Sequence, residues 1–248
     1  IEFLFYAALG AAGGLISTLF VKLLLWMRKH FTRMPAWTAA FQPVAGGLLV
    51  GILGLFIPAV LGVGYSHVSD ALNNRLALGT MVLLVALKLI ATATCYASGN
   101  AGGIFGPSLF IGAMMGGAFG AGAHLILPDY TGSVGAYALV GMGVAFAGII
   151  RAPMTSVIMI FEITRDYSII VPLMIANLMS YFIAGRLQKR PIYQALMDQD
   201  GLQLPTMQRE RDSASLLSQI LRTPDRIVHS ADKIQDVLAT PDSLPAIL

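Results

Sequence analysis

The segment with the residue types best suited to chemistry lies between two strongly apolar stretches. It reads GGIFGP over residues 102–107 and contains no ionisable side chain. Pro107 is typical of the first turn of a helix, where its missing N–H costs no hydrogen bond. The amides from Gly103 to Gly106 therefore lack partners within that helix, and glycine lets a ligand approach the backbone closely. Free amides at the positive end of a helix favour an anion.

Such a site binds its ion weakly. Each contribution of the helix dipole is about 0.3–1 kcal/mol, and about 2 kcal/mol when the site is partly buried. Weak binding suits conduction, because the ion must leave as well as enter. The spacing of residues 102–107 is also compatible with a plain glycine hinge between two packed helices, and the residues alone leave both interpretations open.

A second candidate is Tyr193, which follows Pro191 at a predicted helix start, after a basic loop. A phenol O–H can donate a hydrogen bond to an anion without adding charge. The alternative is an aromatic residue of the membrane interface, where tyrosine is common.

Two ionisable side chains lie within apolar runs, and such residues are functional hypotheses by default. Glu162 can relay protons, pair with Arg165 or Arg151, or cap backbone near a helix end. Lys88 can extend to the membrane surface or pair with a carboxylate.

Enzymatic and metal chemistry find no support in the residues. His67 and His124 have no ligand spacing with each other or with carboxylates, so no metal site is expected. No nucleophile–base arrangement, phosphate-binding loop or dinucleotide fingerprint is present. We therefore expect neither an enzyme nor a cofactor, and the single cysteine, Cys95, excludes an intrachain disulfide.

Composition indicates the elements that must position these residues. Of 248 residues, 12% are charged, 56% are hydrophobic and 26 are glycine. A soluble domain carries about 25% charged residues, and disorder requires far fewer apolar side chains. The sequence therefore predicts an all-α polytopic membrane protein with closely packed helices. The net charge of +3 is too small and scattered to indicate nucleic acid.

Apolar runs divide residues 1–200 into helices, and charge returns in a polar tail over residues 201–248. The runs 42–57 and 153–164 are short for a membrane span, which needs about 20 residues. Short segments interrupted by glycine and proline indicate broken helices, which are typical of transporters. Gly112, Gly116 and Gly120 share one face of a helix predicted over 108–127, a surface for close helix contact. The helix predicted over 3–26 ends in basic residues, which indicates a cytoplasmic end.

Four ordered motifs now point to one family. GGIFGPSL over residues 102–109 resembles the third selectivity-filter motif of the CLC family of chloride channels and proton-coupled chloride antiporters. RAPMT over 151–155, FEIT over 161–164 and PIY over 191–193 are similar to later motifs of the family in order and spacing.

The resemblance implies two inverted helical repeats with broken helices meeting at a central anion path, and a homodimer with one pore per subunit. It implies chloride as the transported ion in a multi-pass protein of the cell membrane, with Ile104 and Phe105 supplying backbone amides and Tyr193 supplying its hydroxyl. The filter motif then comprises Gly103, Ile104, Phe105, Gly106 and Pro107.

The family's first two filter motifs, including the gating glutamate, do not occur in these residues. The chain therefore resembles the second inverted repeat plus the last helix, and we expect a missing first repeat as its partner. Channel and antiporter remain open, and no selective chloride flux is expected from the chain alone. Residues 201–248 would be a cytoplasmic linker and a truncated start of a CBS domain, or a solvated tail. The rival functions are a cation-coupled transporter of a small organic solute and a non-transporting membrane fragment.

Overall fold

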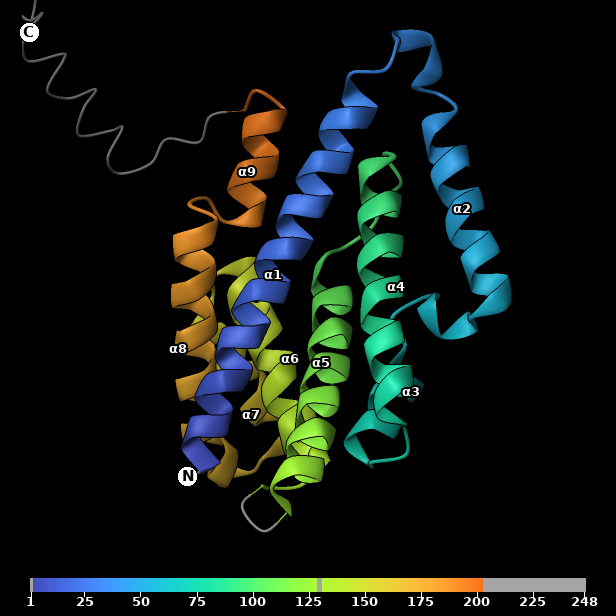
Figure 1. The fold of residues 1–248 in the computed structure, drawn as a ribbon. Helices are drawn as coiled ribbons and strands as arrows, with labels where there is room; N and C mark the ends of the chain where they lie inside the picture. Colours follow the sequence, from blue (N-terminus) through green and yellow to red (C-terminus); the bar gives the residue numbers. More distant parts are fainter. Residues whose placement is uncertain (1, 129–130, 203–248) are drawn as a thin grey trace, which may run out of the picture. The chain divides into compact units, whose positions relative to one another are not determined.

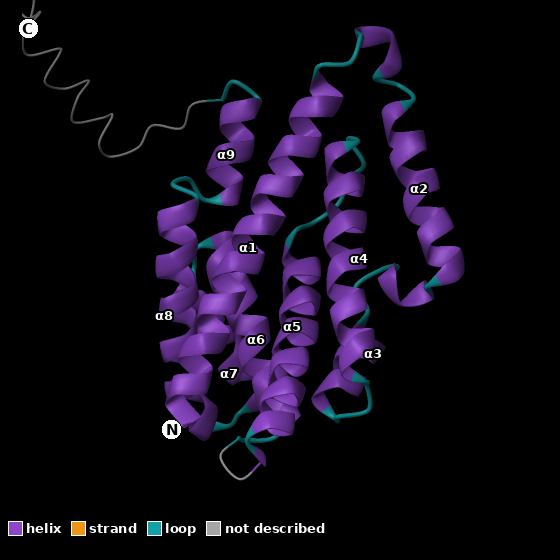
Figure 2. Ribbon diagram, viewed as in Figure 1, coloured by secondary structure: helices purple, strands orange, loops and turns teal. Residues whose placement is uncertain are grey.

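The computed structural model describes residues 2–128 and 131–202, and every regular element in them is helical (Figure 2). The expected CBS segment lies outside the described residues. In chain order the elements are α1 (Glu2–Thr32), η1 (Ala36–Thr38), α2 (Gln42–Phe56), η2 (Pro58–Val60), α3 (Tyr65–Leu72), α4 (Leu78–Ala97), α5 (Phe105–Ile126), α6 (Val134–Ile150), α7 (Pro153–Thr164), η4 (Tyr167–Ile169), α8 (Ile170–Leu187) and α9 (Ile192–Gln199).

Four helical stretches of the described residues are long and apolar enough to cross a membrane. They are α1, α4, α5 and the stretch Tyr167–Gln199, which comprises η4, α8 and α9. Helices α2, α6 and α7 are apolar but shorter, as the sequence predicts for 42–57 and 153–164. Together these elements form a multi-pass membrane protein of all-α class.

The glycine face of α5 packs against α6, which confirms its predicted use (Figure 1). A Cβ added to Gly116 would lie 2.9 Å from the Cα of Gly141, and one added to Gly120 would lie 2.7 Å from the Cβ of Tyr137. Gly112 approaches the Gly141 carbonyl in the same way. Because the two backbones are in contact, no side chain fits between them.

Helices α1 and α8 cover the other side of α6 (Figure 1). Ser17 of α1 and Ser180 of α8 are fully buried, and their hydroxyls donate to the carbonyls of Ala145 and Val144, at 3.4 and 2.8 Å. These hydrogen bonds satisfy the polar groups inside an otherwise apolar core.

Two details differ from the sequence-based expectation. Helix α5 begins at Phe105, three residues before the predicted start, which keeps Pro107 in its first turn. Glu162 is exposed and takes part in neither ion pair found among residues 2–128 and 131–202, which are Arg28–Asp200 and Arg190–Asp198. The expected pairing of Glu162 with Arg165 or Arg151 is therefore wrong for this part of the chain.

Candidate functional site

The first turn of α5 leaves its amides free. The first hydrogen bond of the turn runs from the Ser108 amide to the Ile104 carbonyl, at 3.0 Å. Among the described residues, the amides of Ile104, Phe105 and Gly106 donate to no acceptor, and no side chain caps this helix end. Three consecutive unpaired N–H groups at a helix start are suited to receive an anion.

The side chains of the same turn hold its backbone in place. Ile104 is 1% exposed, and the Phe105 ring packs edge-to-face on Phe146 of α6, with ring centroids 4.9 Å apart. The Ser108 hydroxyl donates to the Phe105 carbonyl at 2.6 Å. The Phe105 carbonyl and the side chains of the turn are therefore engaged, while the amides of Ile104, Phe105 and Gly106 are free.

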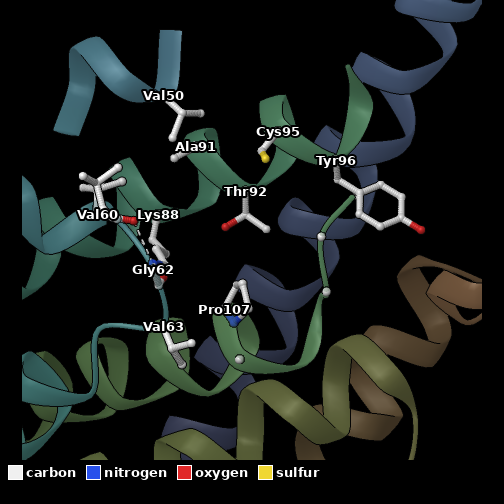
Figure 3. Close-up of a pocket in the computed structure, with 14 residues that line it drawn as sticks. Val50, Val60, Gly62, Val63, Lys88, Ala91, Thr92, Cys95, Tyr96 and Pro107 are labelled. Atoms are coloured by element: carbon white, nitrogen blue, oxygen red, sulfur yellow. Dashed lines mark hydrogen bonds between the residues drawn. The ribbon is translucent and has the colours of Figure 1, made fainter. Parts of the chain in front are cut away.

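The chain before this turn borders a cavity of about 390 Å³ (Figure 3). Gly102, Gly103, Gly106 and Pro107 form one wall, and α4 forms the wall opposite. A Cβ added to Gly102 or Gly103 would have no described atom within 4 Å. The glycines there are thus not required by packing among the described residues, which fits a place where a ligand approaches the backbone.

Lys88 of α4 lines this cavity, but its ammonium group is bound to backbone carbonyls. The side chain is 2% exposed, and its Nζ donates to the carbonyls of Val60 and Gly62, at 2.8 and 2.6 Å (Figure 3). The same Nζ lies 4.8 Å from the centroid of the Phe110 ring on α5. Lys88 therefore joins the end of η2 and the connector after it to α4 and α5. Neither sequence-based option, extension to the membrane surface or a carboxylate partner, applies.

The connector reaches the first turn of α5 as well. Val63 lies beside Gly106, where an added Cβ would be 3.1 Å from the Val63 Cγ1. Gly64, at a φ of 75°, lies against the Phe110 ring. The carbonyls bound by Lys88 thus belong to a segment that packs on the turn carrying the free amides.

Tyr193 is the second residue of α9 and is 43% exposed. Its neighbour Ile192 is fully buried and anchors this end of the helix. Within the described part of the chain, the Tyr193 hydroxyl has no hydrogen-bond partner. Tyr193 does not line the cavity beside α5, whereas Tyr96, near the end of α4, does (Figure 3).

Two arginines bind carbonyls at the ends of α6, α8 and α9. The Arg151 guanidinium donates to the carbonyls of Gly148, Ala184 and Gln188, and so joins the end of α6 to the connector before α9. Arg28 of α1 donates to the Leu196 carbonyl at 3.2 Å and pairs with Asp200 at 2.6 Å. Both arginines stabilise the negative carbonyl ends of helices.

The residues alone do not indicate that Tyr96 lines this cavity, although its position just before a glycine-rich break is a signal that could have marked it. They suggest Arg151 only as a partner for Glu162, whereas its partners are backbone carbonyls. Within residues 2–128 and 131–202, no group of three or more His, Cys, Asp or Glu residues could hold a metal.

A second cavity, of about 750 Å³, lies by the start of α1, where Glu2 and Tyr6 meet Asp166 and Ser168. Asp166 caps η4, and the hydrogen bonds donated by Ser168 lower the pKa of its carboxyl. Ile104, Phe105 and Tyr193 line neither cavity, but Gly103, Gly106 and Pro107 of the predicted filter motif line the cavity beside α5, which is therefore the candidate site.

Comparisons with known proteins show which family the chain resembles. A family model described as "Voltage gated chloride channel" matches residues 1–185, which include the first turn of α5 and end before Tyr193. An H(+)/Cl(-) exchange transporter ClcA from Vibrio campbellii is 33% identical over 195 residues, covering 77% of this chain and 42% of the relative. A putative chloride channel protein ClcB-like from Ralstonia nicotianae is 37% identical over 209 residues, covering 82% of this chain and 48% of the relative.

Among solved structures, a slow cyanobacterial Cl⁻/H⁺ antiporter superposes with a TM-score of 0.75 at 29% identity, covering 80% of this chain and 47% of that chain. The chain thus spans about half the length of the relatives that it matches. Because the family model covers most of the membrane block, including the glycine-rich segment before α5, the chain belongs to the voltage-gated chloride channel (CLC) family.

Proposed function

We propose that this chain forms half of an anion path, as the second inverted repeat and last helix of a protein that moves chloride across a membrane. The observation that carries the proposal is the first turn of α5, with three unpaired amides beside a cavity and no ionisable side chain between residues 102 and 107. The names of the relatives, which are exchangers and channels for chloride, support the choice of ion.

In this proposal, chloride gives up water for hydrogen bonds from the chain. The amides of Ile104 and Phe105 donate to the ion, and so does the Tyr193 hydroxyl. The positive end of α5 adds a contribution of about 0.3–2 kcal/mol without placing a cation at the ion. The ion is therefore stabilised enough to enter and loosely enough to leave. The activity is transport and not a chemical conversion, so it needs no cofactor.

The remaining ligands come from a first repeat, which we place in the half of the relatives' length that this chain does not match. That repeat would also carry the gating glutamate and would decide between a channel and a proton-coupled antiporter. The exposed apolar side chains of α7 and α8, among them Ile158 and Phe182, face either lipid or a second copy in a homodimer.

Chloride flux into liposomes tests the proposal. We expect the full-length protein to carry chloride selectively and the 248-residue chain alone to carry none, because half of the ligands are then absent. Robust selective flux from the chain alone would refute the proposed division of the site. Flux of an organic solute by the full-length protein without dependence on anions would refute chloride transport.

Calorimetry tests the assignment of Tyr193. Replacing Tyr193 with Ala removes one charge-assisted hydrogen bond, which is worth about 1.5–3 kcal/mol, so chloride affinity should fall about 10- to 100-fold. Tyr65→Ala is the matched control, since Tyr65 is 74% exposed on α3 and does not line the cavity beside α5. Unchanged affinity in Tyr193→Ala would remove Tyr193 from the site.

A further inference from the structure

Three polar contacts join the last turns of α1 and α9. The Arg28 guanidinium donates to the Leu196 carbonyl at 3.2 Å and pairs with the Asp200 carboxylate at 2.6 Å. The Gln199 side-chain amide donates to the Leu25 carbonyl at 3.1 Å. The two helices lie side by side at this end (Figure 1). These contacts form a clamp, the α1–α9 clamp, between helices that are far apart in the sequence.

Arg28 makes the central contacts of the α1–α9 clamp. Its side chain is 19% exposed and that of Asp200 is 46% exposed, so the guanidinium is partly withdrawn from water. An ion pair between fully exposed side chains contributes little to stability. The same guanidinium also binds a carbonyl in the last turn of α9, where the helix dipole favours a cation. Arg28 thus holds the end of α9 at two points.

The clamp lies one helical turn from Tyr193. Helix α9 comprises only Ile192–Gln199, and Tyr193 precedes Leu196 by one turn. Isolated helices shorter than about 12 residues are only marginally stable, so contacts with neighbouring helices determine where α9 lies. Ile192 is buried at the start of the helix, and the clamp holds the other end. The direction of the Tyr193 phenol therefore depends on both contacts.

We propose that Arg28 is a positioning residue for the anion site, because it clamps the end of α9 to α1 and so holds the Tyr193 hydroxyl where it binds the anion. The inference rests on the proposed function and deepens it, since it takes Tyr193 as a ligand. Arg28 acts through α9 and not on the ion itself. The apparent affinity for the anion then falls in proportion to the fraction of molecules in which α9 is docked.

Chloride titrations of the full-length protein by calorimetry test this inference. Arg28→Gln removes the ion pair and the charged donor to the Leu196 carbonyl, so chloride affinity should fall about 3- to 10-fold. Asp200→Asn breaks the ion pair but leaves the bond to the Leu196 carbonyl, so its effect should be smaller. Lys29→Gln is the matched control. It removes the same charge from the next position of α1, where the side chain is exposed and belongs to neither ion pair of the described residues, and it should bind chloride as the parent protein does.

The decisive readout is whether the effect of Arg28 depends on Tyr193. Tyr193→Phe should itself weaken chloride binding. In that background, Arg28→Gln should weaken binding no further, because the hydroxyl that Arg28 positions is already absent. A general loosening of the fold would instead weaken binding by the same factor with and without the Tyr193 hydroxyl.

The outcomes separate this inference from the proposed function. If Tyr193→Phe weakens chloride binding and Arg28→Gln does not, the positioning role is refuted and the anion site stands. If Arg28→Gln weakens binding equally in both backgrounds, it does not act through Tyr193 and the inference is wrong. If Tyr193→Phe binds chloride as tightly as the parent protein, both the assignment of Tyr193 and the inference are refuted.

Discussion

The first turn of α5 and the first turn of α9 carry the two arms of the candidate site, and they are held in opposite ways. The α5 turn is continuous with the core: Ile104 and Phe110 are each 1% exposed, and the helix lies in backbone contact with α6. Helix α9 has eight residues, and arginine side chains bind the Leu196 carbonyl near its end and the Gln188 carbonyl of the connector before it.

The difference indicates which arm can adjust. Local opening costs little where few apolar contacts are broken and costs the global free energy of unfolding in a packed core. We therefore expect the amide arm to be fixed and the phenol arm to open more easily. A site that must release its ion benefits from one rigid set of hydrogen-bond donors and a second set that can move away from the ion.

The largest expected effect comes from breaking the packing under the amide arm. Replacing Gly116 with Leu would force a side chain into the contact with Gly141 of α6, where even a Cβ would be 2.9 Å from the Gly141 Cα. Overpacking of this kind costs about 3 kcal/mol, and thermal unfolding in detergent measures it. Gly51→Leu on α2 is the control, since no described atom lies within 4 Å of its added Cβ. Equal midpoints for the two variants would contradict the proposed tight contact.

The next effect concerns the buried lysine behind the amide arm. Replacing Lys88 with Met leaves the carbonyls of Val60 and Gly62 without their donor, which costs about 1–3 kcal/mol. Hydrogen exchange should then rise in residues 60–64, which pack on the first turn of α5. Lys88→Arg retains the charge and several donors, so it should restore part of the protection. Unchanged exchange in Lys88→Met would show that the connector is held by packing alone.

A smaller and more local effect is expected at the phenol arm. Replacing Arg151 with Met removes its hydrogen bonds to the Ala184 and Gln188 carbonyls. The lost hydrogen bonds should cost about 1.5 kcal/mol, so hydrogen exchange over residues 188–196 should rise about 10-fold. Hydrogen exchange in α5 should not change. Arg186→Met is the matched control, because Arg186 lies over the Phe182 ring and makes no hydrogen bond to a carbonyl in the described residues. An equal rise in α5 would mean that the two arms open together.

The smallest effect tests the start of the segment that leads to α5. The Asn100 side chain donates to the Pro43 carbonyl at 3.0 Å and to the Ser98 hydroxyl at 3.1 Å, which ties the segment to α2. Asn100→Ala should cost about 0.5–1.5 kcal/mol and increase exchange only near residues 98–103. An effect as large as that of Gly116→Leu would mean that the amide arm depends on α2 and not on α6.

Much of this fold could be predicted from the residues, because apolar runs between glycine, proline and charged clusters delimit helices directly. The close contact of α5 with α6 was predictable for the same reason: three glycines on one helix face admit a second backbone. The free amides followed from Pro107 and its glycine neighbours, although α5 begins at Phe105 and not at Ser108.

The partners of Lys88 and Arg151 could not be predicted. Both side chains bind backbone carbonyls of segments distant in the sequence. Because every residue has a backbone carbonyl, no particular residue type in the sequence indicates the partner. The assignment of Ile104, Phe105 and Tyr193 to the ion remains a prediction.

Bromide diffraction tests the central claim most directly, because bromide replaces chloride and scatters anomalously. In crystals of the full-length protein soaked in bromide, we predict an anomalous peak within hydrogen-bond distance of the Ile104 and Phe105 amides and the Tyr193 hydroxyl. A well-ordered α5 turn with no bromide peak near those amides would contradict the account.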